Sequence, residues 1–149
     1  MPSIRERLSE DLKVAMREKA ELRLSTIRMM RSEILNKDKE HGEETGEEDI
    51  LKVLQFMVKK CEEAAEQFVK GGREDIAAKE REEIRIIQGY LPAQIGDEEL
   101  RQAVQTAIAE TGASSLKEMG KVMGLLTKQL AGRATGGRIS QLVKELLSG

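Results

Sequence analysis

Apolar residues recur three and four positions apart along almost the whole chain, which is the spacing of one face of a helix. No stretch alternates apolar and polar residues for long enough to predict a strand, and no internal repeat is visible. The core must be aliphatic, because the 149 residues include only three aromatic ones. A composition of 39% hydrophobic and 35% charged residues suits amphipathic helices with solvated outer faces. We therefore predict an all-α fold.

Four helices are predicted before residue 91. Ser3 opens the first, with Glu6 three residues later as in a capping box, and Gly71 and Gly72 can end the third. Between the second and third helices, residues 36–49 (NKDKEHGEETGEED) lack apolar side chains, so we expect a mobile loop or a frayed helix end. The apolar positions of the four helices are, in order, Ile4, Leu8, Leu12, Ala15 and Met16; Leu24, Ile27, Met30, Ile34 and Leu35; Ile50, Leu54, Met57, Cys61, Ala65 and Phe68; and Ile76, Ala77, Ile84, Ile87 and Leu91.

The tripeptide YLP at residues 90–92 indicates a domain boundary, because proline restricts the residue before it and cannot continue a helix. We predict a helical bundle over residues 1–91 and a small three-helix domain over residues 92–149. Asp97 is expected to cap a helix that ends near Gly112. Ser115, with Glu118 three residues later, opens the next helix in a second capping box, and the last helix runs from near residue 137 to residue 147.

The formal charge of −2 conceals an uneven distribution along the chain. Residues 1–31 sum to +3, residues 32–111 to −9 and residues 112–149 to +4. Basic regions separated by an acidic middle suggest contact with a polyanion, although charges of this size are also compatible with simple solvation. The opening MPSIRERLSED has no apolar stretch for a secretory signal, and no segment approaches the roughly 20 apolar residues of a membrane span. We expect a cytoplasmic protein that does not bind membranes.

A helix over residues 116–131 would carry three neighbouring stripes at 100° per residue. A strip of small residues bordered by ammonium groups would let a phosphate backbone approach closely and be neutralised. The alternative is that the glycines let a neighbouring helix pack closely while the lysines are only solvated. The stripes are an apolar one of Leu116, Met119, Met123, Leu126 and Leu130; a small one of Gly120, Gly124, Thr127 and Ala131; and a basic one of Lys117, Lys121 and Lys128.

The following turn, GRATGGRIS at residues 132–140, supplies a second argument for anion binding. Gly136 and Gly137 free the backbone, Arg133 and Arg138 bring charge, and the last helix begins here with unpaired N–H groups. The alternative is a helix corner in which the glycines serve the turn and the arginines are solvated. The turn is not a nucleotide-binding P-loop, because Arg138 and Ile139 stand where lysine and serine or threonine are required, and no strand precedes it.

The sequence offers little for catalysis. His41 is the only histidine and lies in the acidic segment, while Cys61 falls on an apolar seam, where we expect a buried and inert thiol. A di-iron bundle would need Glu-x-x-His twice, which one histidine cannot supply. We predict no catalytic residue, no metal and no cofactor. The main carboxylates are expected largely on the outer faces of helices: Glu62, Glu63, Glu66, Glu80, Glu82 and Glu83.

Three segments together resemble the YqeY-like proteins: LSTIRMM at residues 24–30, YLPAQI at 90–95, and MGKVMG followed by LAGRATGGRISQLVKELL. They are also similar to the C-terminal tail domain of the B subunit of the tRNA-dependent glutamyl/aspartyl amidotransferase. The resemblance covers essentially the whole chain and implies an N-terminal helical bundle with a small three-helix C-terminal domain. In the amidotransferase that tail contributes tRNA recognition, whereas the amidating chemistry lies in other domains. One departure is Thr135, which stands where the family turn commonly has aspartate and which can still cap a helix.

Our leading hypothesis is a non-catalytic module that binds structured RNA, most of all tRNA, through backbone and shape. The scarcity of aromatic residues disfavours recognition by base stacking. Two alternatives stay open: a protein interaction module, and an accessory of glutamine-dependent amidation of aminoacyl-tRNA with aminoacyl-tRNA synthetase or amidotransferase components as partners. The residues assigned to RNA are Lys117, Lys121, Lys128, Arg133 and Arg138 for phosphates; Gly120, Gly124, Gly136 and Gly137 for close approach; and Arg28 and Arg31 as a candidate second basic surface, for which structural salt bridging is the alternative.

Overall fold

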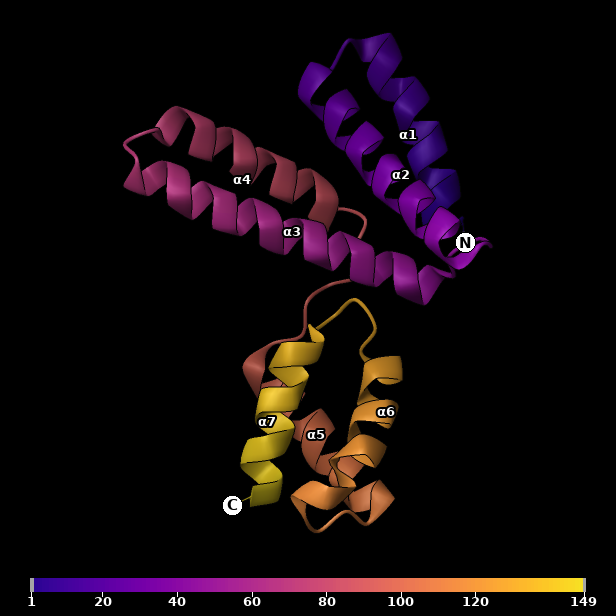
Figure 1. The fold of residues 1–149 in the computed structure, drawn as a ribbon, viewed down its shortest axis with the longest axis vertical. Coiled ribbons are helices and arrows are strands. Elements are labelled where there is room, and N and C mark those ends of the chain that lie inside the picture. The colour runs from indigo at the N-terminus through magenta and orange to yellow at the C-terminus, as the bar shows by residue number, and fades with distance from the viewer. Residues whose placement is uncertain (1, 149) are drawn as a thin grey trace. The chain divides into compact units, whose positions relative to one another are not determined.

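The computed structural model describes residues 2–148, which form seven α-helices and one short 3-10 helix and contain no strand (Figure 1). The predicted all-α fold is confirmed. The helices form two compact units that divide between Pro92 and Ala93. The N-terminal unit holds α1 (Ile4–Glu18), α2 (Glu21–His41), α3 (Glu47–Lys70) and α4 (Glu74–Gln88), and the C-terminal unit holds α5 (Asp97–Thr111), η1 (Leu116–Glu118), α6 (Met119–Gln129) and α7 (Gly136–Ser148).

Helix α1 begins as the sequence predicts, because the Ser3 hydroxyl accepts a hydrogen bond from the Glu6 N–H at 3.1 Å. The reciprocal half of the capping box does not form. The next N–H along the chain, that of Ile4, donates to the carboxylate of Glu47 at 3.0 Å, at the start of α3. The first turn of α1 is thereby fixed to α3, and one of its unpaired N–H groups is satisfied from another helix.

The expectation of a mobile loop or frayed end over residues 36–49 is wrong for much of that segment. Helix α2 continues to His41, and only residues 42–46 connect it to α3. Thr45 is buried, and its N–H donates to the Asp38 carboxylate at 2.7 Å. The Arg5 guanidinium donates to both oxygens of Asp38, at 2.7 and 3.1 Å, and holds the pKa of that carboxyl well below its usual range. Charged side chains that looked solvated in the sequence therefore pair across the chain.

In the N-terminal unit, α1 lies beside α2 and α3 lies beside α4 (Figure 1). Their shared core is aliphatic, as the composition requires. Each fully buried leucine or isoleucine side chain contributes about 1.5–3 kcal/mol relative to exposure. The best-buried large residues of this core are Leu8, Ile27, Met30, Ile50, Leu54 and Ile87.

Tyr90 anchors the end of this unit. Its hydroxyl donates to the Asp11 carboxylate, and the Arg7 guanidinium lies 4.7 Å from its ring centroid. Arg7 also donates to the Gly89 carbonyl at 2.9 Å. Burial, with the Asp11 hydrogen bond, raises the pKa of Tyr90 to about 12. The tyrosine of the YLP segment thus ties the end of α4 to α1.

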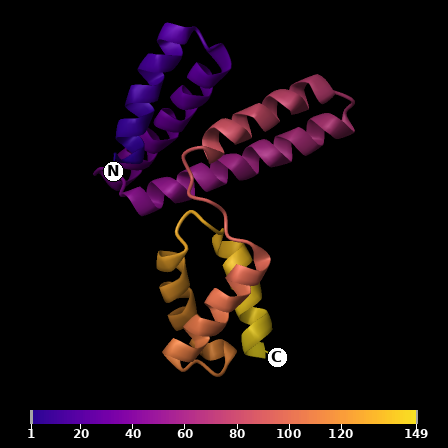
Figure 2. The same cartoon turned by 180° about the vertical axis from the view of Figure 1, so that it is seen from behind.

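In the C-terminal unit, α5, α6 and α7 pack against one another in all three pairs, and Figure 2 shows α5 crossing the face between the other two. The core consists of aliphatic residues at helical spacing on each helix. Its best-buried members are Leu100, Val104, Val122, Leu126, Ile139 and Val143.

One predicted helix cap in this unit is wrong in register, and a second has the predicted position without the predicted hydrogen bond. Gly96, not Asp97, precedes α5, and the Asp97 carboxylate pairs with Arg138 instead. The Ser115 side chain makes no capping hydrogen bond; the Glu118 carboxylate accepts from the N–H and the hydroxyl of Ser114, both at 3.2 Å. The α5 cap thus lies one residue earlier than predicted, since glycine is also acceptable at this position, whereas Ser115 does precede the 3-10 helix as predicted.

Candidate nucleic-acid interface

The small-residue stripe of α6 is open at its centre. Gly120 and Gly124 are both exposed, and a Cβ atom built on either would meet no other atom within 4 Å. Thr127 and Ala131 are half-buried, and the Thr127 hydroxyl donates to the Met123 carbonyl at 2.8 Å. Because nothing in residues 2–148 approaches the two glycines, close packing of a neighbouring helix of this chain does not explain them.

The buried face of α6 is rotated from the predicted one. Leu126 and Leu130 are buried as expected, but Leu116 is 49% exposed and the fully buried Val122 lies outside the predicted apolar stripe. Leu116 is exposed because Leu116–Glu118 forms a separate 3-10 helix before α6, whereas Val122 lies inside α6 at the edge of the predicted stripe, four residues before Leu126. With about 3.0 residues per turn instead of 3.6, this element shifts the angular position of everything before Met119.

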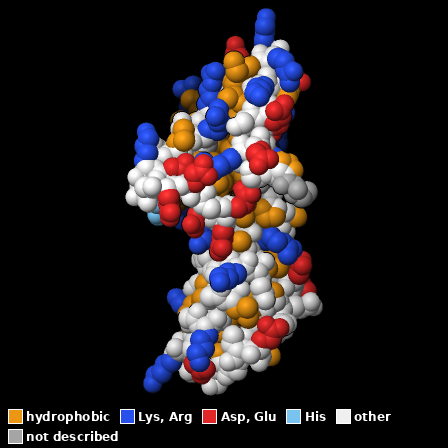
Figure 3. Space-filling model, turned by 90° about the vertical axis from the view of Figure 1, so that its right-hand side faces the viewer, with side chains coloured by type: hydrophobic (Ala, Val, Ile, Leu, Met, Phe, Trp, Pro, Cys, Tyr) orange, Lys and Arg blue, Asp and Glu red, His pale blue; other side chains and the backbone are white. Residues whose placement is uncertain are grey.

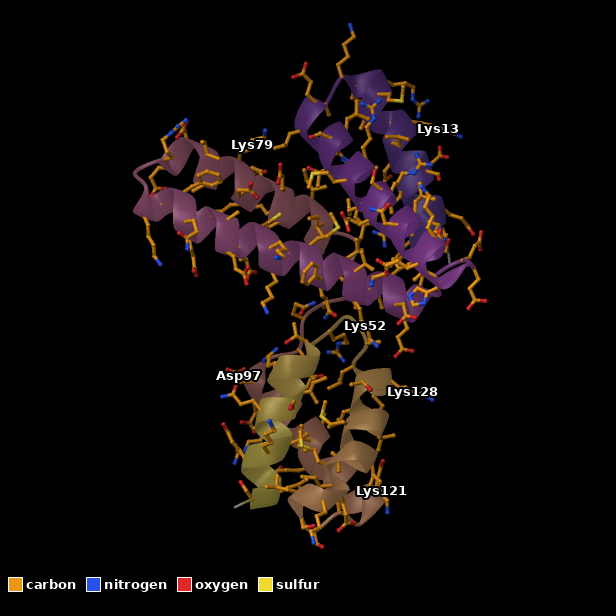
Figure 4. The ribbon with its side chains drawn as sticks, in the orientation of Figure 1. Lys13, Lys52, Lys79, Asp97, Lys121 and Lys128 are labelled. Atoms are coloured by element: carbon orange, nitrogen blue, oxygen red, sulfur yellow. The ribbon has the colours of Figure 1, made fainter. Side chains whose placement is uncertain are left out.

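Two lysines of the predicted basic face stand together on α6. Lys121 and Lys128 extend from the side of the helix away from α7 (Figure 4). Both are exposed, and neither forms an ion pair with residues 2–148. Their seven-residue separation spans about 10 Å along the axis, with Gly124 between them. Lys117 is also exposed but lies on η1, outside the continuous face of α6.

Figure 3 looks onto this side of the C-terminal unit. Separate basic side chains stand there among white areas of backbone and uncharged polar groups, with some acidic and hydrophobic side chains also in view. We call the face formed by Gly120, Lys121, Gly124 and Lys128 the α6 basic face.

Arg133 is held by partners inside its own unit. Its Nε donates to the Ala93 carbonyl at 3.2 Å, and its terminal nitrogen pairs with the Glu99 carboxylate at 3.4 Å. The Arg133 carbonyl in turn accepts from the Ile95 N–H at 3.0 Å. The residue therefore ties the turn after α6 to the segment that precedes α5.

Arg138 is engaged in the same way. Its guanidinium donates to the Ile95 carbonyl at 2.8 Å and to the Asp97 carboxylate at 2.6 Å. The side chains of Arg133 and Arg138 remain about one third exposed, at 35% and 34%. A phosphate at this turn would thus compete with carboxylates already paired with both cations. The alternative interpretation, in which both arginines are only solvated, is therefore wrong, because each guanidinium group donates to partners within the unit.

The turn itself is shaped by one glycine and one threonine. Gly132 has a φ of 77°, a left-handed conformation that favours glycine. The Thr135 hydroxyl accepts from the Arg138 N–H at 3.2 Å, so threonine does cap α7 in place of the family's aspartate. Gly136 and Gly137, the first two residues of α7, are exposed, with no atom near a built Cβ.

Arg28 and Arg31, the candidate second basic surface, line different hollows. Arg28 lies beside a hollow between α2 and α3, and Arg31 faces a smaller one of about 200 Å³ that Arg5 also lines. Neither arginine forms an ion pair with the described residues, so structural salt bridging does not account for them.

A different arginine cluster escaped the sequence analysis. Arg7, Arg23 and Arg85 line a hollow of about 290 Å³ around Tyr90 and Asp11. The three arginines come from α1, α2 and α4, so no spacing along the chain could have grouped them.

Glu83 is an exception to the prediction that the carboxylates of α3 and α4 lie on the outer faces of their helices. It is buried on α4, with a carboxylate oxygen 3.9 Å from the Cys61 sulfur, and Glu80 lies beside both. Burial, together with the nearby Glu80 carboxylate, raises the pKa of Glu83. Burial likewise raises the pKa of the Cys61 thiol to about 12, which fits the predicted inert thiol. The spacing Ala77, Glu80, Glu83, Ile87 follows one helical face and could have predicted this.

These features define a small all-helical protein of two separately packed units, with a basic, glycine-containing helix face on the second. Among the described helices, none combines the length and apolar character that a membrane crossing requires. The family model described as "Yqey-like protein" matches residues 5–147, and the chain belongs to that family.

The curated relatives include fungal proteins named "Altered inheritance of mitochondria protein 41, mitochondrial". The one from Pyrenophora tritici-repentis is 31% identical over 145 residues, which is 95% of this chain and 79% of the relative. Those from Clavispora lusitaniae and Kluyveromyces lactis are 31% identical over 144 residues and 37% identical over 87 residues. The matched region covers 94% of this chain and 82% of the Clavispora protein, but 58% of this chain and 47% of the Kluyveromyces protein.

Proposed function

We propose that this protein is a non-catalytic module that binds structured RNA of the tRNA class through the α6 basic face. The observation that carries the proposal is the pairing of two open glycines with two lysines that have no acidic partner in residues 2–148. A glycine inside a helix costs about 0.5–1 kcal/mol relative to alanine. Since no packing within residues 2–148 requires Gly120 or Gly124, an outside ligand that needs close approach would account for that cost.

The chemistry of the face suits a phosphate backbone. Each ammonium group that neutralises a phosphate releases bound counterions, and this release drives the association. The bare strip between the lysines lets sugar and phosphate atoms come close to the helix backbone. With so few aromatic residues in the chain, the protein would read backbone and shape rather than stacked bases.

Arg133 and Arg138 take a supporting part in this proposal. Their internal hydrogen bonds tie the turn between α6 and α7 to the segment before α5. The resemblance to the amidotransferase tail domain supports tRNA as the class of RNA, and it allows an accessory role in glutamine-dependent amidation. The expected cytoplasmic location belongs to the same proposal, and the fungal relatives are mitochondrial by name.

The test is binding of the full chain to an unmodified tRNA transcript at several salt concentrations. Lys121→Glu and Lys128→Glu should each weaken binding and lower the slope of log K against log salt by about 1. Lys144→Glu is the matched control, because it makes the same charge change at an exposed position of α7. The proposal fails if the parent chain shows no binding at low salt, or if the control weakens binding as much as the two α6 variants.

The open glycine strip also favours a second candidate, docking of a partner helix against α6. Gly124→Leu would obstruct either ligand, whereas charge reversal at Lys121 and Lys128 separates them. A loss of partner binding with Gly124→Leu, combined with no response to the charge reversals, would favour the helix.

A further inference from the structure

A hollow of about 560 Å³ lies between α2 and α3 in the N-terminal unit, and we call it the α2–α3 hollow. Its walls carry apolar side chains that the fold leaves open to solvent. Met29 on α2 is 44% exposed and Phe56 on α3 is 57% exposed, while Met57 beside them is buried. Met16, Leu35 and Val69 are also exposed in this unit, but Met29 and Phe56 come from two helices and line the same hollow, which indicates a surface that a ligand covers.

The hollow is elongated along α2. Its lining residues on that helix fall at positions 25, 28, 29, 32 and 33, which is one face over two turns, or about 12 Å. The lining residues on α3 are at positions 56, 57, 60 and 61, which form one face of a little more than one turn of that helix and lie across the hollow from α2. The small side chains of Ser25 and Ser32 leave room between the larger ones. A short helix with apolar residues three and four positions apart matches this length and spacing.

The rim of the hollow is mainly positive. Arg28 and Lys60 line it, and neither forms an ion pair with residues 2–148. The Lys60 ammonium group lies 5.2 Å from the Phe56 ring centroid, so it is held over the apolar wall. Glu33 is the one acidic residue of the lining. An incoming ligand with carboxylates beside its apolar side would pair with both cations.

We infer that the α2–α3 hollow binds an amphipathic helix of another protein, with leucine-like anchors along one face and acidic residues at its edge. A second copy of this chain is a poorer occupant, because the same face turned on itself would set Arg28 and Lys60 against like charges with only Glu33 to offset them. This surface is separate from the α6 basic face in its residues, in the unit that carries it and in the class of ligand it would bind. The inference therefore stands or falls independently of RNA binding.

The test uses the full chain and a fluorescein-labelled 14-residue peptide held helical by a side-chain bridge, with leucines at positions 3, 7 and 10 and glutamates flanking them. A counterpart with lysine in place of every glutamate is the comparison peptide. In fluorescence anisotropy, the acidic peptide should bind about tenfold more tightly than its counterpart at moderate salt. Phe56→Ala and Lys60→Glu should each weaken the acidic peptide about tenfold or more.

Two matched controls share α3 with these variants. Lys59→Glu makes the same charge change at the neighbouring exposed position outside the hollow, and Val69→Ala removes an apolar group that is 38% exposed elsewhere on α3. Both should leave peptide binding unchanged, with circular dichroism checking that every variant is folded. Equal binding of the two peptides, or equal effects of Lys59→Glu and Lys60→Glu, would overturn the inference. It would also be overturned if dodecanoate bound in a Phe56-dependent way while neither peptide bound.

Discussion

Arg138 donates to the carboxylate of Asp97 at 2.6 Å, which joins the first turn of α7 to the first residue of α5. The same guanidinium donates to the Ile95 carbonyl at 2.8 Å. Asp97 is fully exposed, so the ion pair itself contributes little, whereas the hydrogen bond to a part-buried carbonyl contributes more. An arginine that the sequence suggests as a phosphate ligand therefore has a structural task in the C-terminal unit.

Replacing Arg138 with glutamine should lower the free energy of unfolding of the C-terminal unit by about 1 kcal/mol, because the Ile95 carbonyl loses its charged donor. The salt dependence of tRNA binding should stay unchanged. Urea unfolding followed by circular dichroism measures the first quantity, and Lys144→Gln is a control without these contacts. A reduced salt slope with unchanged stability would instead make Arg138 a phosphate ligand.

Two glycines of the same unit should respond in opposite directions to alanine. Gly124→Ala should raise the free energy of unfolding by about 0.5–1 kcal/mol, since the new Cβ meets nothing and a helix interior prefers alanine. Gly132→Ala should lower it by about 1–2 kcal/mol, because φ is 77° there. Thermal unfolding of the two variants measures both effects. Destabilisation by Gly124→Ala would mean that the α6 glycines do serve internal packing.

The helices were predictable because their apolar residues follow a local rule. The periodic positions from Ile4 to Leu130 place most of the core correctly, and Ser3 caps α1 as expected. Leu116 was wrongly assigned to the apolar face of α6 because it lies in a 3-10 helix that precedes α6, and no composition rule marks that change of helix type.

The candidate site was harder to predict, because its side chains depend on partners distant in the sequence. Arg133 and Arg138 find their acceptors in residues 93–99, some forty positions earlier. Sequence spacing could place Lys121, Gly124 and Lys128 on one side of a helix, since that requires only the helical period. The apolar walls of the α2–α3 hollow come from two helices, and only tertiary packing brings Met29 and Phe56 to one hollow.

Glu83 should make stability depend on pH. Burial raises its pKa in the folded chain above the ordinary value of 4.5, so the folded state holds the proton more tightly than the unfolded state. The favourable contribution of the protonated form is complete below the ordinary pKa and is lost as pH rises through the raised one. Glu83→Gln should therefore raise the melting temperature at pH 7 by a few degrees, roughly 2–6 °C, with the gain shrinking toward pH 4.

Glu62→Gln is the control for that measurement, because Glu62 is exposed on α3 and forms no ion pair with the described residues. Its effect on the melting temperature should be near zero at both pH values. A gain for Glu83→Gln that is equal at pH 4 and pH 7 would contradict a buried carboxylate with a raised pKa.

The Cys61 thiol should resist alkylation in the folded protein. It is only 6% exposed, and burial beside Glu80 and Glu83 raises its pKa to about 12, so almost none of it is thiolate at pH 8. Its reaction with iodoacetamide should be more than about a hundredfold slower in the native chain than in 6 M guanidinium chloride, where the thiol is solvated. Mass spectrometry of timed samples gives both rates from this single cysteine. Comparable rates in the two conditions would show that the sulfur is accessible and ionised, and would contradict its placement beneath the α2–α3 hollow.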